Sequence, residues 1–231
     1  MVYYDIHTHH LPVHPEDIAI VNRLVPTLDA GSHLEQAMSR LNARTGLFCS
    51  VGIHPWYIYS VEEQLAELER QTSFPNVVAI GETGLDKGAE APLDRQQEIF
   101  KASASLAEST GLFLIIHCVK AWSELIASKK ELKPRMPWVI HGFRGNAILA
   151  GQLIRQGFYL SFGEYFNPGA VREAWPCRLF AETDDREIDI RTVYRNLSAS
   201  LDLSPEQVAA QIAESTGLFL IIHCFLMQSW L

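Results

Sequence analysis

The length and composition of the chain indicate a folded protein. It has 231 residues, of which 48% are hydrophobic and 20% charged, a balance that excludes an intrinsically disordered chain. The formal net charge of −8 argues against a protein that coats duplex nucleic acid through many Lys and Arg contacts, but it leaves phosphodiester chemistry at a local site open. No apolar run reaches the roughly 18 residues that a membrane span needs.

The cysteines and the first residues favour a cytoplasmic location. None of Cys49, Cys118, Cys177 and Cys224 belongs to a C-x-x-C pair, and four cysteines in a chain of this length would make a sparse disulfide framework. Residues 1–5 turn polar at once, unlike a signal peptide. We therefore expect a reducing cytoplasm, no membrane association and no obligate protein partner.

Short apolar segments alternate with helix-forming segments along the chain. We expect strands at residues 3–7, 18–25, 47–54, 77–82, 112–117, 138–141, 158–162 and 178–184. Several are continuous apolar runs, which are typical of parallel strands covered by helices on both faces. Eight such strands alternating with helices predict an α/β fold, a (β/α)8 TIM-type barrel that is distorted in places, formed as a single domain. A doubly wound open sheet is the structural alternative.

Helix boundaries are marked by capping patterns. Ser60 with Glu63 three residues later predicts a helix start, and Gly111 is expected to end a helix over residues 94–109. Ser204 followed by Pro205 predicts another start, because proline suits the first helical position.

A segment of twelve residues occurs twice. Ala107–Cys118 recurs without change as Ala213–Cys224. Repeat architectures need several imperfect copies at short period, so we interpret this single perfect copy as a recent duplication or a sequence artefact. The predicted barrel therefore covers residues 1–212, and residues 213–231 form an atypical C-terminal tail.

Two histidines follow the first predicted strand. In Asp5–His9, His7 and His9 are two residues apart, so both side chains can point to one face and share an ion. The alternative is a pair of packed or exposed histidines without a ligand.

Metal-competent side chains also end later strands. Glu82 has the reach to bridge two ions, and a salt-bridged glutamate is its alternative role. His117 and His141 each end an apolar strand, where a single histidine is usually a satisfied core residue, but two on neighbouring strands favour a shared ligand role.

Asp184 stands where the eighth strand is expected to end. It can bind a metal and accept a proton from a water molecule. The alternative is a helix N-cap for a segment that begins near Arg186, a role that suits Asp185 better.

The six side chains support one another more strongly than each does alone. The carboxyl ends of barrel strands converge on one face, where active sites lie. The sequence therefore predicts a metal centre made of His7, His9, Glu82, His117, His141 and Asp184.

These motifs resemble the TatD family of metal-dependent hydrolases, within the amidohydrolase superfamily, from residue 3 to about residue 212. The segments that carry the resemblance are Asp5–His9, Gly52–Pro55, Gly81–Asp86, Ile116–Cys118, His141–Gly145 and Glu182–Asp184. The resemblance implies two divalent ions, which are zinc, magnesium or manganese. It implies that one ion is held by His7, His9 and Asp184, that the other is held by His117 and His141, and that Glu82 bridges both.

The chain departs from the family pattern at three places on the substrate side. Val119-Lys120, Gly142–Arg144 and Asp185-Arg186 stand where the family often has Arg, Cys-Phe-Thr and Ala-Pro-Tyr. Lys120 and Arg144 each follow a predicted ligand histidine by three residues, so we expect them on rim loops, holding substrate anions. Solvated surface charge is the alternative for both.

His54 and Trp56 are further candidates near the predicted site. We expect His54 to contact substrate or support the site, and its alternative is a loop histidine before Pro55. Trp56 could stack on a nucleobase, although aromatic residues beside loops more often pack against neighbours.

The sequence predicts a metal-dependent hydrolase acting on ester bonds, a TatD-type deoxyribonuclease that cleaves phosphodiester bonds of single-stranded or terminal DNA. Asp184 and Glu82 would have the catalytic roles. One alternative keeps the metal centre but changes the bond to an amide, lactone or other ester, because related barrels perform all of these reactions. A second alternative is a metal-binding protein without turnover.

Overall fold

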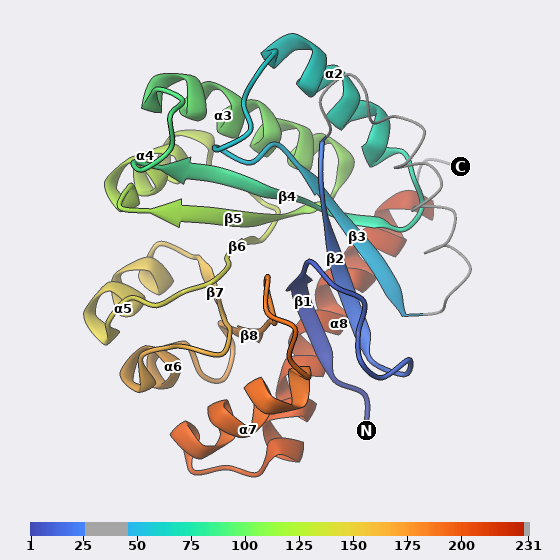
Figure 1. Cartoon of the computed structure of the whole chain (residues 1–231), viewed down its shortest axis with the longest axis vertical. Helices are drawn as coiled ribbons and strands as arrows, with labels where there is room; N and C mark the ends of the chain where they lie inside the picture. Colours follow the sequence, from blue (N-terminus) through green and yellow to red (C-terminus); the bar gives the residue numbers. More distant parts are fainter. Residues whose placement is uncertain (26–45, 229–231) are drawn as a thin grey trace. The chain divides into compact units, whose positions relative to one another are not determined.

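The sheet contains eight strands in the order in which they occur along the chain (Figure 1). The computed structural model describes residues 1–25 and 46–228, with side chains up to residue 217. The strands are β1 (Tyr4–Thr8), β2 (Ile18–Leu24), β3 (Leu47–Gly52), β4 (Val77–Asp86), β5 (Phe113–Val119), β6 (Trp138–Ile140), β7 (Tyr159–Phe162) and β8 (Leu179–Ala181). The predicted (β/α)8 barrel is confirmed, and the strand order excludes a doubly wound sheet, in which the order reverses at a switch point.

Helices alternate with the strands from β3 onward. They are α2 (Val61–Thr72), α3 (Leu93–Thr110), α4 (Trp122–Leu132), α5 (Ala147–Arg155), α6 (Pro168–Ala174), α7 (Ile190–Leu201) and α8 (Pro205–Gln228). The predicted starts at Ser60 and Ser204 and the predicted stop at Gly111 are confirmed. At α8 the cap is reciprocal, since Ser204 N–H donates to Gln207 Oε1 at 2.9 Å and Gln207 N–H donates to Ser204 Oγ at 3.3 Å.

The described chain divides into two compact units. The terminal unit contains Met1–Val21 and the residues from Pro137 onward, and the central unit contains Asn22–Met136. Within the terminal unit, α8 packs against β1 and α7. The Tyr194 hydroxyl of α7 is buried there and donates to the Tyr4 carbonyl at 3.0 Å, which fixes α7 to the first strand.

Backbone hydrogen bonds join β1 to the chain just after β8, within the terminal unit. Asp184 N–H donates to His7 O at 3.0 Å, and His9 N–H donates to Asp184 O at 2.9 Å. β8 ends at Ala181 and not at the predicted residue 184, and Asp184 has a φ of 55°, in the left-handed region that strands do not adopt. The first and last strands therefore meet at the carboxyl end of the sheet, as closure of a barrel requires.

In the central unit, β4 and β5 continue beyond the predicted ends. Their parallel register runs from Ala79 opposite Phe113 to Asp86 opposite Val119. Gly84 permits this close approach, since a Cβ there would lie 1.9 Å from the carbonyl oxygen of His117. Glu82 and His117 consequently lie within paired strands and not at strand ends.

The alternative of a helix that begins near Arg186 and is capped by Asp185 is excluded. Helix α7 begins at Ile190, and its N-cap is Asp189, whose side chain accepts from Arg191 N–H at 3.0 Å. Residues 183–188 instead form tight turns, with Arg186 N–H donating to Thr183 O and Ile188 N–H donating to Arg186 O.

We expect Asp189→Ala to lower the free energy of unfolding by about 1 kcal/mol, because it leaves a helix N–H without its acceptor. Asp189→Asn keeps an acceptor and should cost less.

Burial raises the pKa of Asp189, but the Arg191 N–H, His14 and the Arg191 charge together lower the pKa below its ordinary value of 3.8. The charge therefore stabilises the fold above pH 3.8, and this stabilisation is lost as pH falls through the lowered pKa. Urea unfolding of the three proteins between pH 7 and pH 3 measures both effects, and equal stability of Asp189→Ala and wild type at pH 7 would contradict the cap.

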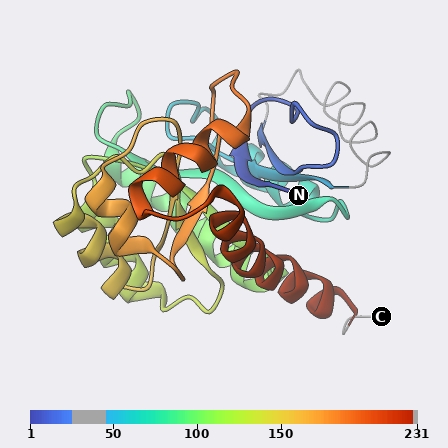
Figure 2. The same cartoon turned by 90° about the horizontal axis from the view of Figure 1, so that it is seen from below.

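The duplicated segment has two different structures. In Ala107–Cys118 the helix ends at Gly111, which has a φ of 71°, and the chain continues into β5. In Ala213–Cys224 the backbone is helical throughout α8 (Figure 2). The first copy gains backbone hydrogen bonds from β4, whereas the second extends a helix already started at Pro205, and adding residues to a helix is easier than nucleating one.

Candidate metal centre

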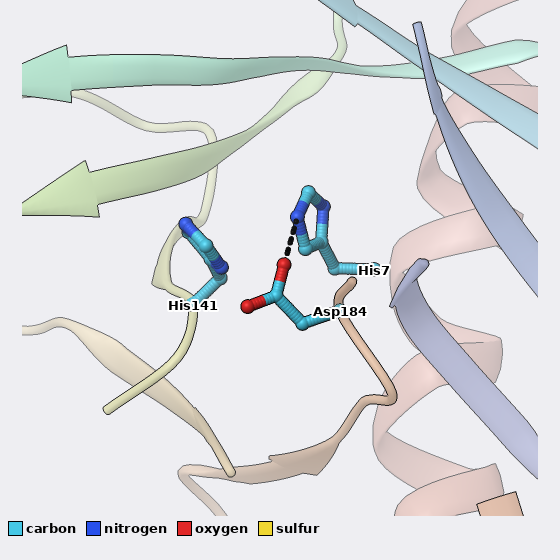
Figure 3. Close-up of side chains that lie close together, drawn as sticks. All are labelled: His7, His141 and Asp184. Carbon is cyan, nitrogen blue, oxygen red and sulfur yellow. Dashed lines mark ion pairs between the residues drawn. The ribbon is translucent and has the colours of Figure 1, made fainter. Parts of the chain in front are cut away.

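Two histidines and an aspartate of the terminal unit converge at the carboxyl ends of its strands. His7 lies on β1, His141 follows β6 and Asp184 follows β8. One donor atom from each lies within 4.8 Å of the others (Figure 3). His7 Nε2 is 3.4 Å from Asp184 Oδ1, and the His7 and His141 ring centroids are 4.3 Å apart. We call these three residues the terminal triad.

His9 lies beside the terminal triad. Its Nε2 is 3.7 Å from Asp184 Oδ1, and its ring makes an edge contact with that of His7 at 5.3 Å. The His7 side chain is fully buried, whereas that of His9 is 35% exposed, so the first is fixed by packing and the second faces the opening of the site.

The side chain of Glu182 lies next to His141 of the terminal triad. Its side chain is fully buried, and Oε1 accepts the Gly142 N–H at 2.5 Å and lies 3.5 Å from His141 Nδ1. The Gly142 N–H therefore holds the Glu182 carboxylate beside the His141 ring, at ion-pair distance.

A second cluster lies in the central unit. Glu82 Oε1 is 2.9 Å from His117 Nδ1 and 3.2 Å from His54 Nε2, and one donor atom from each residue lies within 4.8 Å of the others. His54 and Glu82 are buried. We call these three residues the central triad.

Asn22 fixes the strand that carries Glu82. Its Oδ1 accepts the Glu82 N–H at 2.9 Å, and its Nδ2 donates to Glu82 Oε2 at 3.4 Å. Ser50 Oγ donates to the same Oδ1 at 3.3 Å, so that the amide of Asn22 is held in one orientation. A carboxylate held by neighbouring groups in this way is suited to a metal site.

Asp86 orients His117 from the other side of the ring. Its Oδ2 lies 3.1 Å from His117 Nε2 and accepts the Trp56 indole N–H at 2.7 Å, while Oδ1 accepts the Gly88 N–H at 2.7 Å. Burial raises the pKa of Asp86, but the hydrogen bonds from Gly88, His117 and Trp56 together lower the pKa below its ordinary value. The carboxylate is therefore charged at neutral pH and holds the ring of His117.

We expect Asp86→Ala to lower metal affinity about 10- to 100-fold, the usual cost of losing a residue that orients a ligand histidine. Calorimetric titration of the chelator-treated protein with Mn²⁺ measures the effect. Glu90→Ala, which removes a nearby exposed carboxylate, is the matched control. Equal affinity of Asp86→Ala and wild type would show that Asp86 does not position His117.

The donor chemistry of both triads fits a divalent metal ion. Each triad offers two imidazole nitrogens and one carboxylate, and such mixed sets accept several first-row ions. Bringing one carboxylate and two imidazoles together in a mostly buried site is costly unless they are compensated by one another or by a cation. A bound cation would supply that compensation.

The predicted ligands belong to both compact units. His7, His9, His141 and Asp184 lie in the terminal unit, and Glu82 and His117 lie in the central unit. His141 lies beside His7 and Asp184, although the resemblance implies that it pairs with His117. The roles of the six residues as ligands remain predictions.

The four residues expected near the substrate have different environments. His54, expected to contact substrate or support the site, is buried beside Glu82, so it is itself a candidate ligand. Lys120 and Arg144 are exposed on the chain just after β5 and β6, where their predicted role in holding anions stays a prediction. Trp56 is 59% exposed, but its indole N–H is committed to Asp86.

Sequence reasoning gave no role to several residues that contact the candidate ligands. Asp86 and Glu182 both lie in the segments that carry the family resemblance, and each is a carboxylate at the carboxyl end of a buried strand, which is the kind of signal that identified Glu82. Asn22 carried no signal, because a lone asparagine in a strand has no characteristic spacing.

Most of the chain matches one known protein family. Residues 12–218 match the family described as TatD related DNase. The chain belongs to this family. The match begins after His7 and His9, so their assignment to the metal centre rests on the geometry above.

Curated relatives of this TatD-related chain include hydrolases and nucleases. The uncharacterized metal-dependent hydrolase YabD of Bacillus subtilis is 33% identical over 133 residues, which are 56% of this chain and 52% of YabD. A protein of Edwardsiella piscicida named 3'-5' ssDNA/RNA exonuclease TatD is 33% identical over 118 residues, which are 49% of this chain and 45% of that protein. The chain therefore spans about half the length of the curated relatives it matches.

A solved structure supports the fold of this TatD-related chain. The TatD homologue YjjV of Escherichia coli K12 superposes with a TM-score of 0.78 at 19% identity, covering 93% of this chain and 96% of YjjV. Among residues 1–25 and 46–228, none of the helices has both the length and the hydropathy that crossing a bilayer requires.

Proposed function

We propose that the chain is a metal-dependent phosphodiesterase acting on single-stranded nucleic acid, and that the terminal triad and the central triad each hold one divalent ion. The terminal triad carries the proposal, because it combines two imidazoles with an accessible carboxylate at the carboxyl end of the barrel strands. Family membership and the nuclease names of the relatives favour phosphodiesters over amides or lactones. The bridging role of Glu82 and the cytoplasmic location stay predictions.

Divalent ions bound at the triads would supply Lewis acidity at the phosphoryl oxygens and so lower the barrier to attack by water. The residues of the chain supply orientation and proton transfer. Asp184 is 24% exposed, so that its carboxylate can reach a water molecule and accept its proton as the new P–O bond forms. The bond from phosphorus to the leaving nucleoside oxygen breaks, and solvent protonates that oxygen. Asp86 holds the ring of His117 during this step, and the Glu182 carboxylate lies beside the ring of His141.

A substrate panel tests the proposal. The full chain is incubated with Mn²⁺, Mg²⁺ or Zn²⁺ and with single-stranded DNA, single-stranded RNA, duplex DNA, an amide and a lactone. We expect metal-dependent cleavage of the single strands that EDTA abolishes. Cleavage of the amide or lactone alone would replace the proposal with the first alternative. Metal binding without any turnover would replace it with the second.

A further inference from the structure

A hollow in the terminal unit adjoins Asp184. Residues from the segments after β6, β7 and β8 line it, among them Arg144, Tyr165 and Arg186. All three side chains are exposed, and Tyr165 is 55% exposed. The proposed proton acceptor and two guanidinium groups thus share one concave surface with an aromatic ring. We call Arg144, Tyr165 and Arg186 the aromatic platform.

The two arginines flank the ring of Tyr165 without covering it closely. Their Cζ atoms lie 5.9 Å (Arg144) and 5.6 Å (Arg186) from the ring centroid. Arg178, by contrast, lies 4.2 Å from the Tyr159 centroid, a closely stacked pair at the other ends of β7 and β8. The wider spacing leaves ring surface of Tyr165 open to another planar group.

The hollow is lined by two arginines and by the carboxylates of Glu164, Glu182 and Asp184, and its arginines are the groups that suit a phosphate chain. Glu164 Oε2 accepts from Arg186 at 3.1 Å and partly balances its charge, whereas Arg144 contacts the ring and has no ion-pair partner among the described side chains. Arg144 is therefore the main cation of the platform. A guanidinium can donate two parallel hydrogen bonds to one phosphate, and an adjacent aromatic ring can stack on the base joined to it.

From these positions we infer that the aromatic platform binds the nucleotide next to the cleaved bond. The base stacks on Tyr165, and Arg144 and Arg186 hold the flanking phosphates. This inference rests on the proposed phosphodiesterase function and deepens it by naming what selects single strands. A base inside a duplex is stacked on both faces and cannot reach the ring of Tyr165 until it unpairs, whereas a single-stranded base can.

Pairing a protein variant with a changed substrate tests the stacking contact. We expect Tyr165→Leu to lower kcat/KM on a single-stranded 12-mer roughly 5- to 150-fold, the range for one base–aromatic stack. Tyr165→Phe keeps the ring and should retain the wild-type value. An abasic nucleotide beside the cleaved bond should cost the wild type about as much as Tyr165→Leu costs with the intact strand. Combining the two changes should add little, because both remove the same contact.

A binding measurement gives a readout that does not depend on turnover. The probe is a phosphorothioate single strand carrying 2-aminopurine, whose fluorescence is quenched when it stacks. The metal-loaded full chain should quench it, Tyr165→Phe should quench it equally, and Tyr165→Leu should not. Arg144→Gln should weaken binding of this strand by about 10-fold, and Arg186→Gln should also weaken it. Arg178→Gln, which alters the stacked pair at the far strand ends, should leave the affinity unchanged.

The outcomes separate this inference from the proposed function. If Tyr165→Leu cleaves single strands and quenches 2-aminopurine as the wild type does, the aromatic platform is overturned, but the proposed phosphodiesterase function is not. Quenching that depends on Tyr165, without cleavage of any strand, supports the platform as a binding site and overturns the phosphodiesterase. A loss with Tyr165→Leu that is the same on intact and abasic strands also overturns stacking, because the ring would then act without a base.

Discussion

Asp184→Asn is expected to abolish turnover while the protein stays folded. The amide has the size of the carboxylate but cannot accept a proton from water, and loss of a general base typically costs about 10²- to 10⁴-fold in rate. The hydrogen bonds that join residue 184 to His7 and His9 use backbone atoms, so the substitution leaves them intact. Measuring kcat/KM on a single strand, together with the thermal unfolding midpoint, tests both parts of the expectation.

The neighbouring aspartate provides the matched control for this variant. Asp185 is exposed, and it contacts the His10 ring through its backbone carbonyl and not through its side chain. Asp185→Asn should therefore retain activity. Metal content then separates two roles of Asp184: an inactive Asp184→Asn variant that keeps its metal points to proton transfer, and one that loses metal points to ligation. A folded Asp184→Asn variant with wild-type activity would remove Asp184 from the mechanism.

The fold could be predicted from the sequence because its strands are nearly continuous apolar runs. The run at residues 112–116 is entirely buried in the structure, as strands covered on both faces must be. The exact strand ends could not be predicted. The extension of β4 to Asp86 depends on the close approach of Gly84 to His117, which joins residues distant in sequence.

The duplicated segment shows a second limit of local sequence. The twelve residues are identical in both copies, yet one ends a helix and enters β5 and the other is helical throughout. Any rule based on those residues alone must give the same answer twice. The difference comes from the paired strand β4 beside the first copy and the helix already running into the second.

The candidate ligands could be predicted from the sequence because metal-competent side chains directly after short apolar runs are uncommon, and His7, Glu82 and Asp184 were found in this way. Residues that act by positioning a ligand were harder to predict. Tyr165 was missed, because an isolated tyrosine in a loop has no distinguishing pattern until the arginines on the segments after β6 and β8 are seen beside it.

Glu82→Gln should lower kcat/KM on single strands by at least about 100-fold, since loss of a residue that merely orients a ligand already costs 10- to 100-fold. The amide is a poorer ligand than the carboxylate because it lacks the negative charge that balances a cation. Asn22 can still donate to the remaining side-chain oxygen, so the fold should persist. Glu63→Gln, an exposed position on α2, is the control that should keep full activity.

Metal stoichiometry then decides what Glu82 does. Calorimetric titration of wild type with Mn²⁺ should give two equivalents. If Glu82 serves the central triad alone, Glu82→Gln should still bind one equivalent of Mn²⁺, at the terminal triad. The double variant Glu82→Gln with His141→Ala should then bind none. If Glu82 bridges both ions, as the resemblance implies, Glu82→Gln should weaken both equivalents together, because a bridging carboxylate balances the repulsion between two cations. If Glu82→Gln binds two equivalents of Mn²⁺ as tightly as wild type, Glu82 is not a metal ligand, because losing a ligand lowers the affinity for the ion that it holds.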